Sequence, residues 1–119
     1  TQPLTVAELR RLQALENRYR NAAREVFTNR VEYYHHFTGG HYTSITIRDQ
    51  KTRWGSCTVQ TGKIRLNLSL ARKPEACLEY VLVHELCHLL EPSHNARFHG
   101  LMDKFLPDWR ERKLLLNQK

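Results

Sequence analysis

Residues 74–90 read PEACLEYVLVHELCHLL, a mainly apolar segment that predicts a helix. Pro74 is typical of a helix start, because its fixed φ suits the first turn and its missing N–H has no partner there. Apolar residues then occupy most sides of the predicted helix, which extends to about Leu90. Such a helix has to be covered by neighbouring elements, so we expect it at the centre of the fold.

Two histidines and a glutamate interrupt this apolar helix in the pattern His84-Glu85-Leu86-Cys87-His88. Four residues span about one helical turn, so both imidazoles project from the same side and can share one metal ion. Glu85 lies one step around the helix, where its carboxylate can reach a metal-bound water without being a ligand. Burying a carboxylate without compensation is costly, which favours a functional role over a packing role.

A third ligand is expected shortly after the helix, because a catalytic zinc site takes three protein ligands and keeps one position open. His94 follows the helix-breaking Pro92, and a turn over residues 91–93 can bring its imidazole back to the other two. Glu91 is the alternative, but on a straight helix its carboxylate lies a further turn away. The predicted zinc ligands are His84, His88 and His94.

The other reactive side chains carry weaker signals. His35, His36 and His41 have no ligand-like spacing, and surface or packing roles are predicted for them. His99 could face the site as a proton donor, although packing is the favoured interpretation. Cys57 is disfavoured as a thiolate ligand. Four side chains remain open as groups that could stabilise the oxyanion: Arg53, Arg65, Tyr80 and His99.

Helical periodicity and β-branched runs divide the rest of the chain. A helix is predicted from Thr5 to about Phe27, with Thr5 and Glu8 as its capping box. A second, short helix is predicted over 30–37 and ends at Gly39-Gly40. Strands are predicted over 42–47, 53–59 and 63–68, with a positive φ at Gly62 between the last two, and further helices over 94–105 and 108–116.

Composition and charge limit the function classes. The chain has 119 residues, three cysteines without a C-x-x-C pair and a formal net charge of +7. No apolar run approaches the ~20 residues that cross a bilayer, and no leader-like segment opens the sequence. The odd cysteine count favours a reducing, cytoplasmic setting. Because the positive charge is spread along the chain, we expect only weak nucleic-acid association, through phosphates.

Several motifs in order resemble one known family. They are RWGSC at 53–57, LN at 66–67, HELCHL at 84–89, and SHN at 93–95 followed by Phe98. This set is similar to the YgjP-like metallopeptidase domain, also described as SprT-like, within the zincin group, and the similarity covers roughly residues 45–116. The resemblance implies a zincin-like fold, a zinc ion held by His84, His88 and His94, and Glu85 as catalytic base.

The expected fold class is therefore α+β and zincin-like, in a single domain over residues 1–119. N-terminal helices are expected over 1–40 and a small sheet that contains antiparallel strands over 41–70. The active-site helix and the C-terminal helices are expected over 74–116.

The predicted function is that of a zinc-dependent metallopeptidase acting on a protein or peptide substrate. Two alternatives remain open. A basic domain with a zinc-activated water could hydrolyse a phosphoanhydride, as a nucleotide pyrophosphatase does. A nucleic-acid-associated module with structural zinc could instead use the arginine-rich first helix, although a closed structural site takes four protein ligands and no fourth is obvious.

Overall fold

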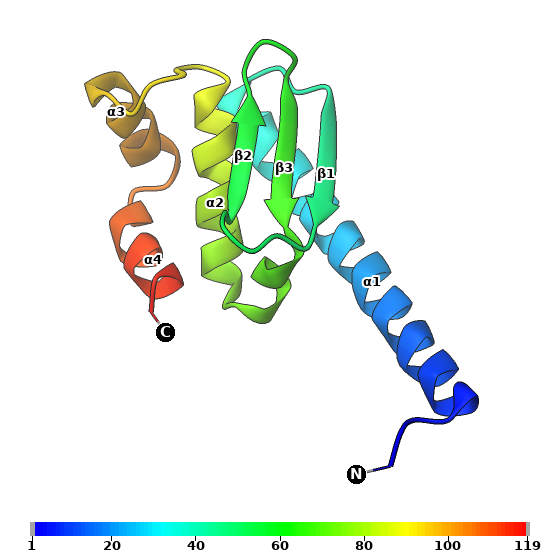
Figure 1. The fold of residues 1–119 in the computed structure, drawn as a ribbon. Coiled ribbons are helices and arrows are strands. Elements are labelled where there is room, and N and C mark those ends of the chain that lie inside the picture. Colours follow the sequence, from blue (N-terminus) through cyan, green and yellow to red (C-terminus); the bar gives the residue numbers. More distant parts are fainter. Residues whose placement is uncertain (1, 119) are drawn as a thin grey trace.

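Helix α2, Glu75–His88, lies at the centre of the fold in the computed structural model, which describes residues 2–118 (Figure 1). The other elements in chain order are α1 (Val6–Thr38), β1 (Ser44–Arg48), β2 (Gly55–Thr58), β3 (Lys63–Asn67), the 3-10 helix η1 (Leu68–Arg72), α3 (Ala96–Phe105) and α4 (Trp109–Leu116). Nine of the 14 residues of α2 are buried, and it packs against α1, α3, α4, β2, β3 and η1. The predicted central position of this helix is confirmed, although the helix ends at His88 rather than Leu90.

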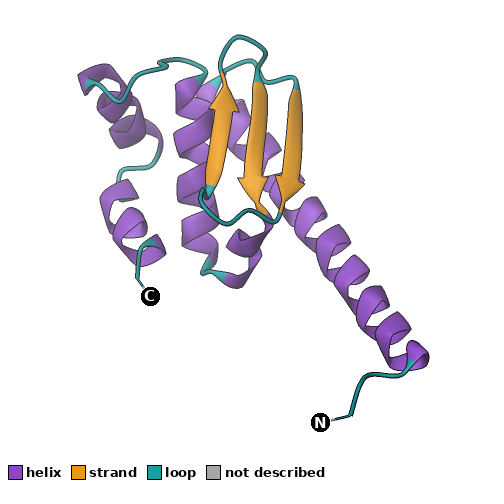
Figure 2. Cartoon of the chain, in the orientation of Figure 1, coloured by secondary structure: helices purple, strands orange, loops and turns teal. Residues whose placement is uncertain are grey.

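The three strands form one mixed sheet in the order β1-β3-β2. β1 pairs with β3 in parallel, and β2 pairs with β3 antiparallel, so the predicted α+β class and its antiparallel pair are confirmed. Figure 2 shows the sheet as one layer in front of α1 and α2; α2 packs on β2 and β3, and α3 and α4 lie on the other side of α2. Ile64 and Leu66 of β3 are fully buried in the core. The turn between β2 and β3 carries Gly62 at a φ of 74°, as the sequence predicts.

The N-terminal region is one continuous helix of 33 residues, so the predicted break between Phe27 and residue 30 is wrong. Thr28 and Asn29, which lie between the two predicted helices, are weak helix formers. Phe27 and Val31 lie four residues apart on the same face and are 1% and 0% exposed. Their burial against the body outweighs the local propensity, which is a small energetic term.

The first half of α1 extends away from the body of the molecule (Figure 1). Its capping box is formed as predicted, because the Glu8 N–H donates to Thr5 Oγ1 at 3.1 Å and the Thr5 N–H donates to Glu8 Oε1 at 3.0 Å. No residue from Val6 to Arg18 is buried. The apolar side chains there, including Leu9 and Leu12, are each about half exposed and do not pack into the core described for residues 2–118.

Asn67 ends β3 one residue earlier than predicted and organises the loop between β1 and β2. Its Nδ2 donates to the carbonyl oxygens of Gln50 and Arg53 at 2.9 and 2.8 Å. Its Oδ1 accepts from the Ser69 N–H at 3.0 Å and so caps the 3-10 helix that Leu68 begins. Because Asn67 is only 3% exposed, its side chain holds residues 50–54 in place from inside the protein.

No helix within residues 2–118 is both long enough and apolar enough to span a bilayer.

We predict that Asn67→Ala lowers the free energy of unfolding by about 1–3 kcal/mol, because it removes the hydrogen bonds that a buried side chain makes to two carbonyl groups. Asn67→Asp is also expected to destabilise the fold at neutral pH, since a carboxylate cannot donate to two carbonyl oxygens. Urea denaturation followed by circular dichroism measures both effects. Asn21→Ala, an exposed change on α1, is the control and should stay within about 0.5 kcal/mol. Equal stability of all three variants would contradict this role for Asn67.

Candidate metal centre

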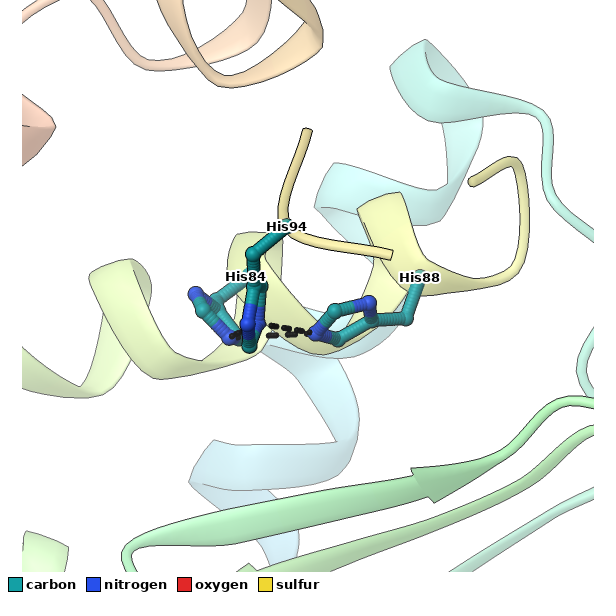
Figure 3. A group of neighbouring side chains, drawn as sticks. All are labelled: His84, His88 and His94. Carbon is teal, nitrogen blue, oxygen red and sulfur yellow. Dashed lines mark hydrogen bonds between the residues drawn. The ribbon is translucent and has the colours of Figure 1, made fainter. Parts of the chain in front are cut away.

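Three imidazoles converge at the C-terminal end of α2. His84 and His88 come from successive turns of the helix, and His94 returns from the loop that follows, so that the three rings point toward one another (Figure 3). The Nε2 atom of His84 lies 3.2 Å from Nε2 of His88 and 3.2 Å from Nε2 of His94. The Nε2 atoms of His88 and His94 are 2.9 Å apart. Among residues 2–118, these three side chains form the group suited to hold a metal ion.

The spacing of these nitrogen atoms fits a tetrahedral metal site. At the usual Zn–N distance of about 2.0–2.1 Å, two ligands of a tetrahedron are separated by roughly 3.3 Å. Three ring nitrogens that face one another at such distances cannot all satisfy each other as donor and acceptor. A cation at their common point satisfies all three lone pairs at once.

The tautomer of His88 is set by the chain itself. Its Nδ1 lies 3.2 Å from the carbonyl oxygen of Glu91, and since a carbonyl only accepts, Nδ1–H must be the donor. In the neutral ring, Nε2 then keeps its lone pair and points toward the other two histidines. Glu91, the alternative third ligand in the sequence, therefore orients His88 through its backbone carbonyl.

The Glu91 carboxylate is engaged elsewhere. Its Oε2 accepts from the Ser93 N–H at 3.3 Å, and its Oε1 lies 3.5 Å from the Arg97 guanidinium. The hydrogen bonds from Ser93 and Asn95 lower the pKa of this carboxyl. These contacts stabilise the turn that carries His94, which places the carboxylate outside the group of three imidazoles.

Phe98 forms the floor beneath the three histidines. Its ring centroid lies 4.9 Å from that of His84, 4.6 Å from His88 and 5.0 Å from His94. It is 2% exposed, and Asn95 begins its helix by accepting from the Phe98 N–H at 3.0 Å. The sequence motif includes Phe98, but its packing role requires the structure, because it depends on where α3 lies relative to α2.

Burial keeps the imidazoles of His84 and His88 neutral. Desolvation, aided by the neighbouring His88 and His94, lowers the pKa of His84 to about 3. Burial also lowers the pKa of His88. A metal ion binds the neutral imidazole, so at physiological pH these rings are in the form that a metal ligand requires.

Glu85 opens onto the same cleft as the histidines although it is only 6% exposed. No side chain or backbone group among residues 2–118 donates a hydrogen bond to its carboxylate. Burial raises its pKa to about 7, and the positive charge of Arg53 partly opposes that rise. A carboxyl with a pKa near neutral can both accept and release a proton at working pH.

Strand β2 forms the opposite wall of this cleft and approaches α2 closely. A Cβ added to Gly55 would lie 2.8 Å from Val81 Cγ1 and 3.1 Å from the Arg65 carbonyl oxygen. The absence of a side chain at Gly55 is therefore what allows the strand to lie beside Glu85. The cleft is also lined by Arg53, Ser56, Cys57 and Val59.

Of the other candidate site residues, some line the cleft or the cavity next to Glu85 and others lie elsewhere. Tyr80 and Arg53 line a cavity next to Glu85, whereas Arg65 donates to Thr58 Oγ1 at 2.9 Å in the sheet. His99 stacks on Trp109 at 5.6 Å between centroids and is not part of the histidine group. Cys57 borders the cleft, but burial and the nearby Glu85 raise the pKa of its thiol to about 11. His35, His36 and His41 are not part of the group either.

An α+β fold with two histidines and a glutamate on its central helix, and a third histidine from the next turn, is that of a zincin-like metallopeptidase. The fold is similar to the crystal structure of the metallopeptidase zymogen of Pyrococcus abyssi abylysin. The TM-score is 0.64 at 23% identity, over 72% of this chain and 87% of that one. The zymogen of Methanocaldococcus jannaschii jannalysin gives a TM-score of 0.64 at 22% identity, over 74% and 90% of the two chains.

Residues 3–119 match the family described as YgjP-like, metallopeptidase domain, and the chain belongs to this family. It is therefore a metal-binding hydrolase of the peptidase class. No curated protein matches the chain closely enough to add a nearer relative.

Glu85 is predicted to make the stability of the metal-free protein depend on pH. Its carboxyl ionises near 4.5 in the unfolded chain and near 7 in the folded one. Between these values the folded state holds more protons than the unfolded chain. The free energy of unfolding is therefore highest below about pH 4.5 and falls as the pH rises through 7. The total loss is about 3 kcal/mol.

Urea denaturation of the metal-free parent and of Glu85→Gln across this pH range measures the effect. The free energy of unfolding of Glu85→Gln relative to the parent should rise by about 3 kcal/mol from the acid to the neutral end. The lowered pKa of His84 changes the free energy of unfolding with pH in the opposite direction. His84 is present in both proteins, however, so its contribution cancels in the difference between them. Parallel pH profiles for the two proteins would contradict the assignment.

Proposed function

We propose that residues 1–119 form a single zinc-dependent metallopeptidase domain that hydrolyses peptide bonds in a protein or peptide substrate. One observation carries the proposal: three Nε2 atoms lie 2.9–3.2 Å apart around a common point, at a cleft that Glu85 also lines. Three neutral imidazoles are a donor set that suits zinc. A ligand set of three, rather than four, also supports an open position for chemistry over a closed structural site.

In this proposal His84, His88 and His94 hold the ion, and each residue around them has a separate task. Bound zinc supplies Lewis-acid activation of water and of the scissile carbonyl. Glu85 accepts a proton from the attacking water at a carboxylate oxygen and then delivers it to the leaving amine. Burial, which raises the pKa of this carboxyl to about 7 in the metal-free protein, favours both transfers by making the protonated form accessible. The Glu91 carbonyl keeps His88 in the tautomer that leaves Nε2 free.

The substrate is proposed to bind as an extended strand beside β2. Because the order is β1-β3-β2, β2 has no further strand beside it within residues 2–118. Its outer main-chain groups are therefore those of a sheet edge, which extended peptides recognise by adding a strand. Since β2 borders the cleft through Gly55, Ser56 and Cys57, such a strand runs past Glu85 and the three histidines.

A cytoplasmic location and weak nucleic-acid binding complete the proposal. Cys57, Cys77 and Cys87 are free thiols, which supports a reducing compartment. The exposed arginines at 10, 11, 18, 20 and 24 lie along α1 on several sides of the helix. This spread supports salt-sensitive contacts to phosphates rather than a sequence-reading element.

Zinc binding is predicted to depend on each of the three histidines. The parent protein should retain about one zinc ion per chain after dialysis, and His84→Ala, His88→Ala or His94→Ala should each lose it, because two imidazoles bind zinc far more weakly than three. Elemental analysis and calorimetric titration measure content and affinity. His36→Ala, an exposed change on α1, is the control and should keep full occupancy. Full zinc content in all three ligand variants would overturn the proposed centre.

A change at Glu85 separates catalysis from metal binding. Glu85→Gln should keep its zinc but lose about 10²–10⁴-fold in turnover of an unfolded protein substrate, the usual contribution of a positioned proton acceptor. Nucleoside triphosphates serve as the second substrate in the same assay. If the zinc-loaded parent hydrolyses only the nucleotide, the centre stands but the nucleotide pyrophosphatase alternative replaces the peptidase. If Glu85→Gln keeps full turnover, the residue is not the general base.

A further inference from the structure

A second cavity of about 240 Å³ adjoins the metal centre on the side of the N-terminal half of α2. It shares Arg53, Gly55, His84 and Glu85 with the cleft that the three histidines border, so the two hollows form one continuous groove. Its apolar walls are Trp54, Tyr80, Val81 and Leu116. The cavity is large enough for one side chain.

Two cations, Arg53 and Lys113, line this cavity. Arg53 comes from the loop before β2, and Lys113 comes from α4 on the other side. Neither forms an ion pair with any carboxylate among residues 2–118, whereas Arg110 and Arg112, close to Lys113 in sequence, are both paired. Among the residues that line the cavity, Glu85 is the only carboxylate. The cavity therefore has a positive end and apolar sides.

Both cations stand on elements that the core holds in place. Arg112 fixes α4 to α2 by donating to the Glu79 carboxylate at 3.1 Å and to the Ala76 carbonyl at 3.4 Å. Trp109 of the same helix stacks on Tyr80 with the rings 9° from parallel. The Arg53 carbonyl is held by Asn67 Nδ2 at 2.8 Å. The backbone positions of Arg53 and Lys113 are thus held by contacts within the protein.

The direction of β2 identifies the part of a substrate that meets this cavity. β2 begins at Gly55, beside Val81, and runs toward the end of the cleft where Val59, Pro92 and His94 lie. We take the substrate strand to pair antiparallel with β2, because antiparallel hydrogen bonding is the more stable per residue, so it runs the opposite way. Its residues before the scissile bond then lie near His94, and the residue after the scissile bond lies over the cavity.

We propose that this cavity binds the carboxylate of the residue that follows the scissile bond, with Lys113 and Arg53 as its specificity-determining residues. The inference rests on the peptidase function proposed above. The carboxylate can belong to an Asp or Glu side chain or to the free C-terminus of the substrate, because both present the same charge to the same donors. Charge-assisted hydrogen bonds of this kind give a preference of about 10- to 100-fold over the neutral amide.

The test uses matched peptides with the zinc-loaded full chain. One pair carries Glu or Gln after the scissile bond, with both C-termini amidated, and a second pair ends one residue after the bond as the free acid or the amide. The kcat/KM ratio within each pair measures preference and identifies the source of the carboxylate. Calorimetric binding of the product peptides that begin with Glu or Gln to zinc-loaded Glu85→Gln gives a readout that does not depend on turnover.

Lys113 is exposed on α4, so substitutions there should leave the fold intact. Lys113→Met should reduce the acid preference about tenfold or more in both readouts, and Lys113→Glu should shift the preference toward Lys after the scissile bond. Lys104→Met, an exposed change on α3, is the control and should leave the ratios unchanged. Arg53→Lys should retain the preference that Arg53→Met weakens, since the charge is kept.

The outcomes separate the two proposals. Acid preference in either pair that Lys113→Met removes supports the carboxylate cavity. Equal kcat/KM and equal binding for acid and amide, with hydrolysis intact, overturns the cavity but leaves the peptidase. Selective binding of the acidic products without hydrolysis of any peptide supports the cavity and overturns the peptidase. Nucleoside triphosphate binding that depends on Lys113, with acidic and neutral peptides bound alike, overturns the carboxylate assignment.

Discussion

One helix has to fill the core and carry the reactive groups, and the rest of the structure depends on that constraint. In α2, Leu82 and Leu86 are fully buried, while Glu85 between them is also buried and His84 is partly buried. Desolvation disfavours the charged form of each, and it raises the pKa of Glu85 and lowers that of His84. The packing that stabilises the fold is therefore also what provides a neutral imidazole, the form that metal ions bind, and a carboxyl that titrates near neutral pH.

The cleft around these groups is held by contacts whose purpose is geometric. Gly55 allows the edge strand to approach α2, and Asn67 holds the preceding loop by its two buried donors. Phe98 supports all three imidazoles from below. None of the three has chemistry of its own to contribute to the site. Each instead limits how far a reactive side chain can move, which is the requirement that preorganised sites place on their surroundings.

The C-terminal helices connect stability to the shape of the groove. Arg112 links α4 to Glu79 of α2, and the Tyr34 hydroxyl from α1 donates to the same carboxylate. Leu116 and Trp109 are buried in the common core. The helix that completes the core is thus the one that brings Lys113 to the cavity beside Glu85. A change in how α4 packs would alter both the core and that cavity.

The sequence by itself determined the features that adjacent residues encode. The one-turn spacing of His84 and His88, the capping box at Thr5 and the positive φ at Gly62 depend on interactions within a few residues, so they could be predicted directly. The tertiary structure alone decided that α1 continues through residues 28–29 and that β2 is an edge strand. It also decided that Phe98 lies beneath the three histidines, that Lys113 lines the adjoining cavity and that Asn67 holds the loop before β2. These features depend on which distant faces are buried together, because burial energy exceeds local propensity and is summed over contacts that no short stretch of sequence contains.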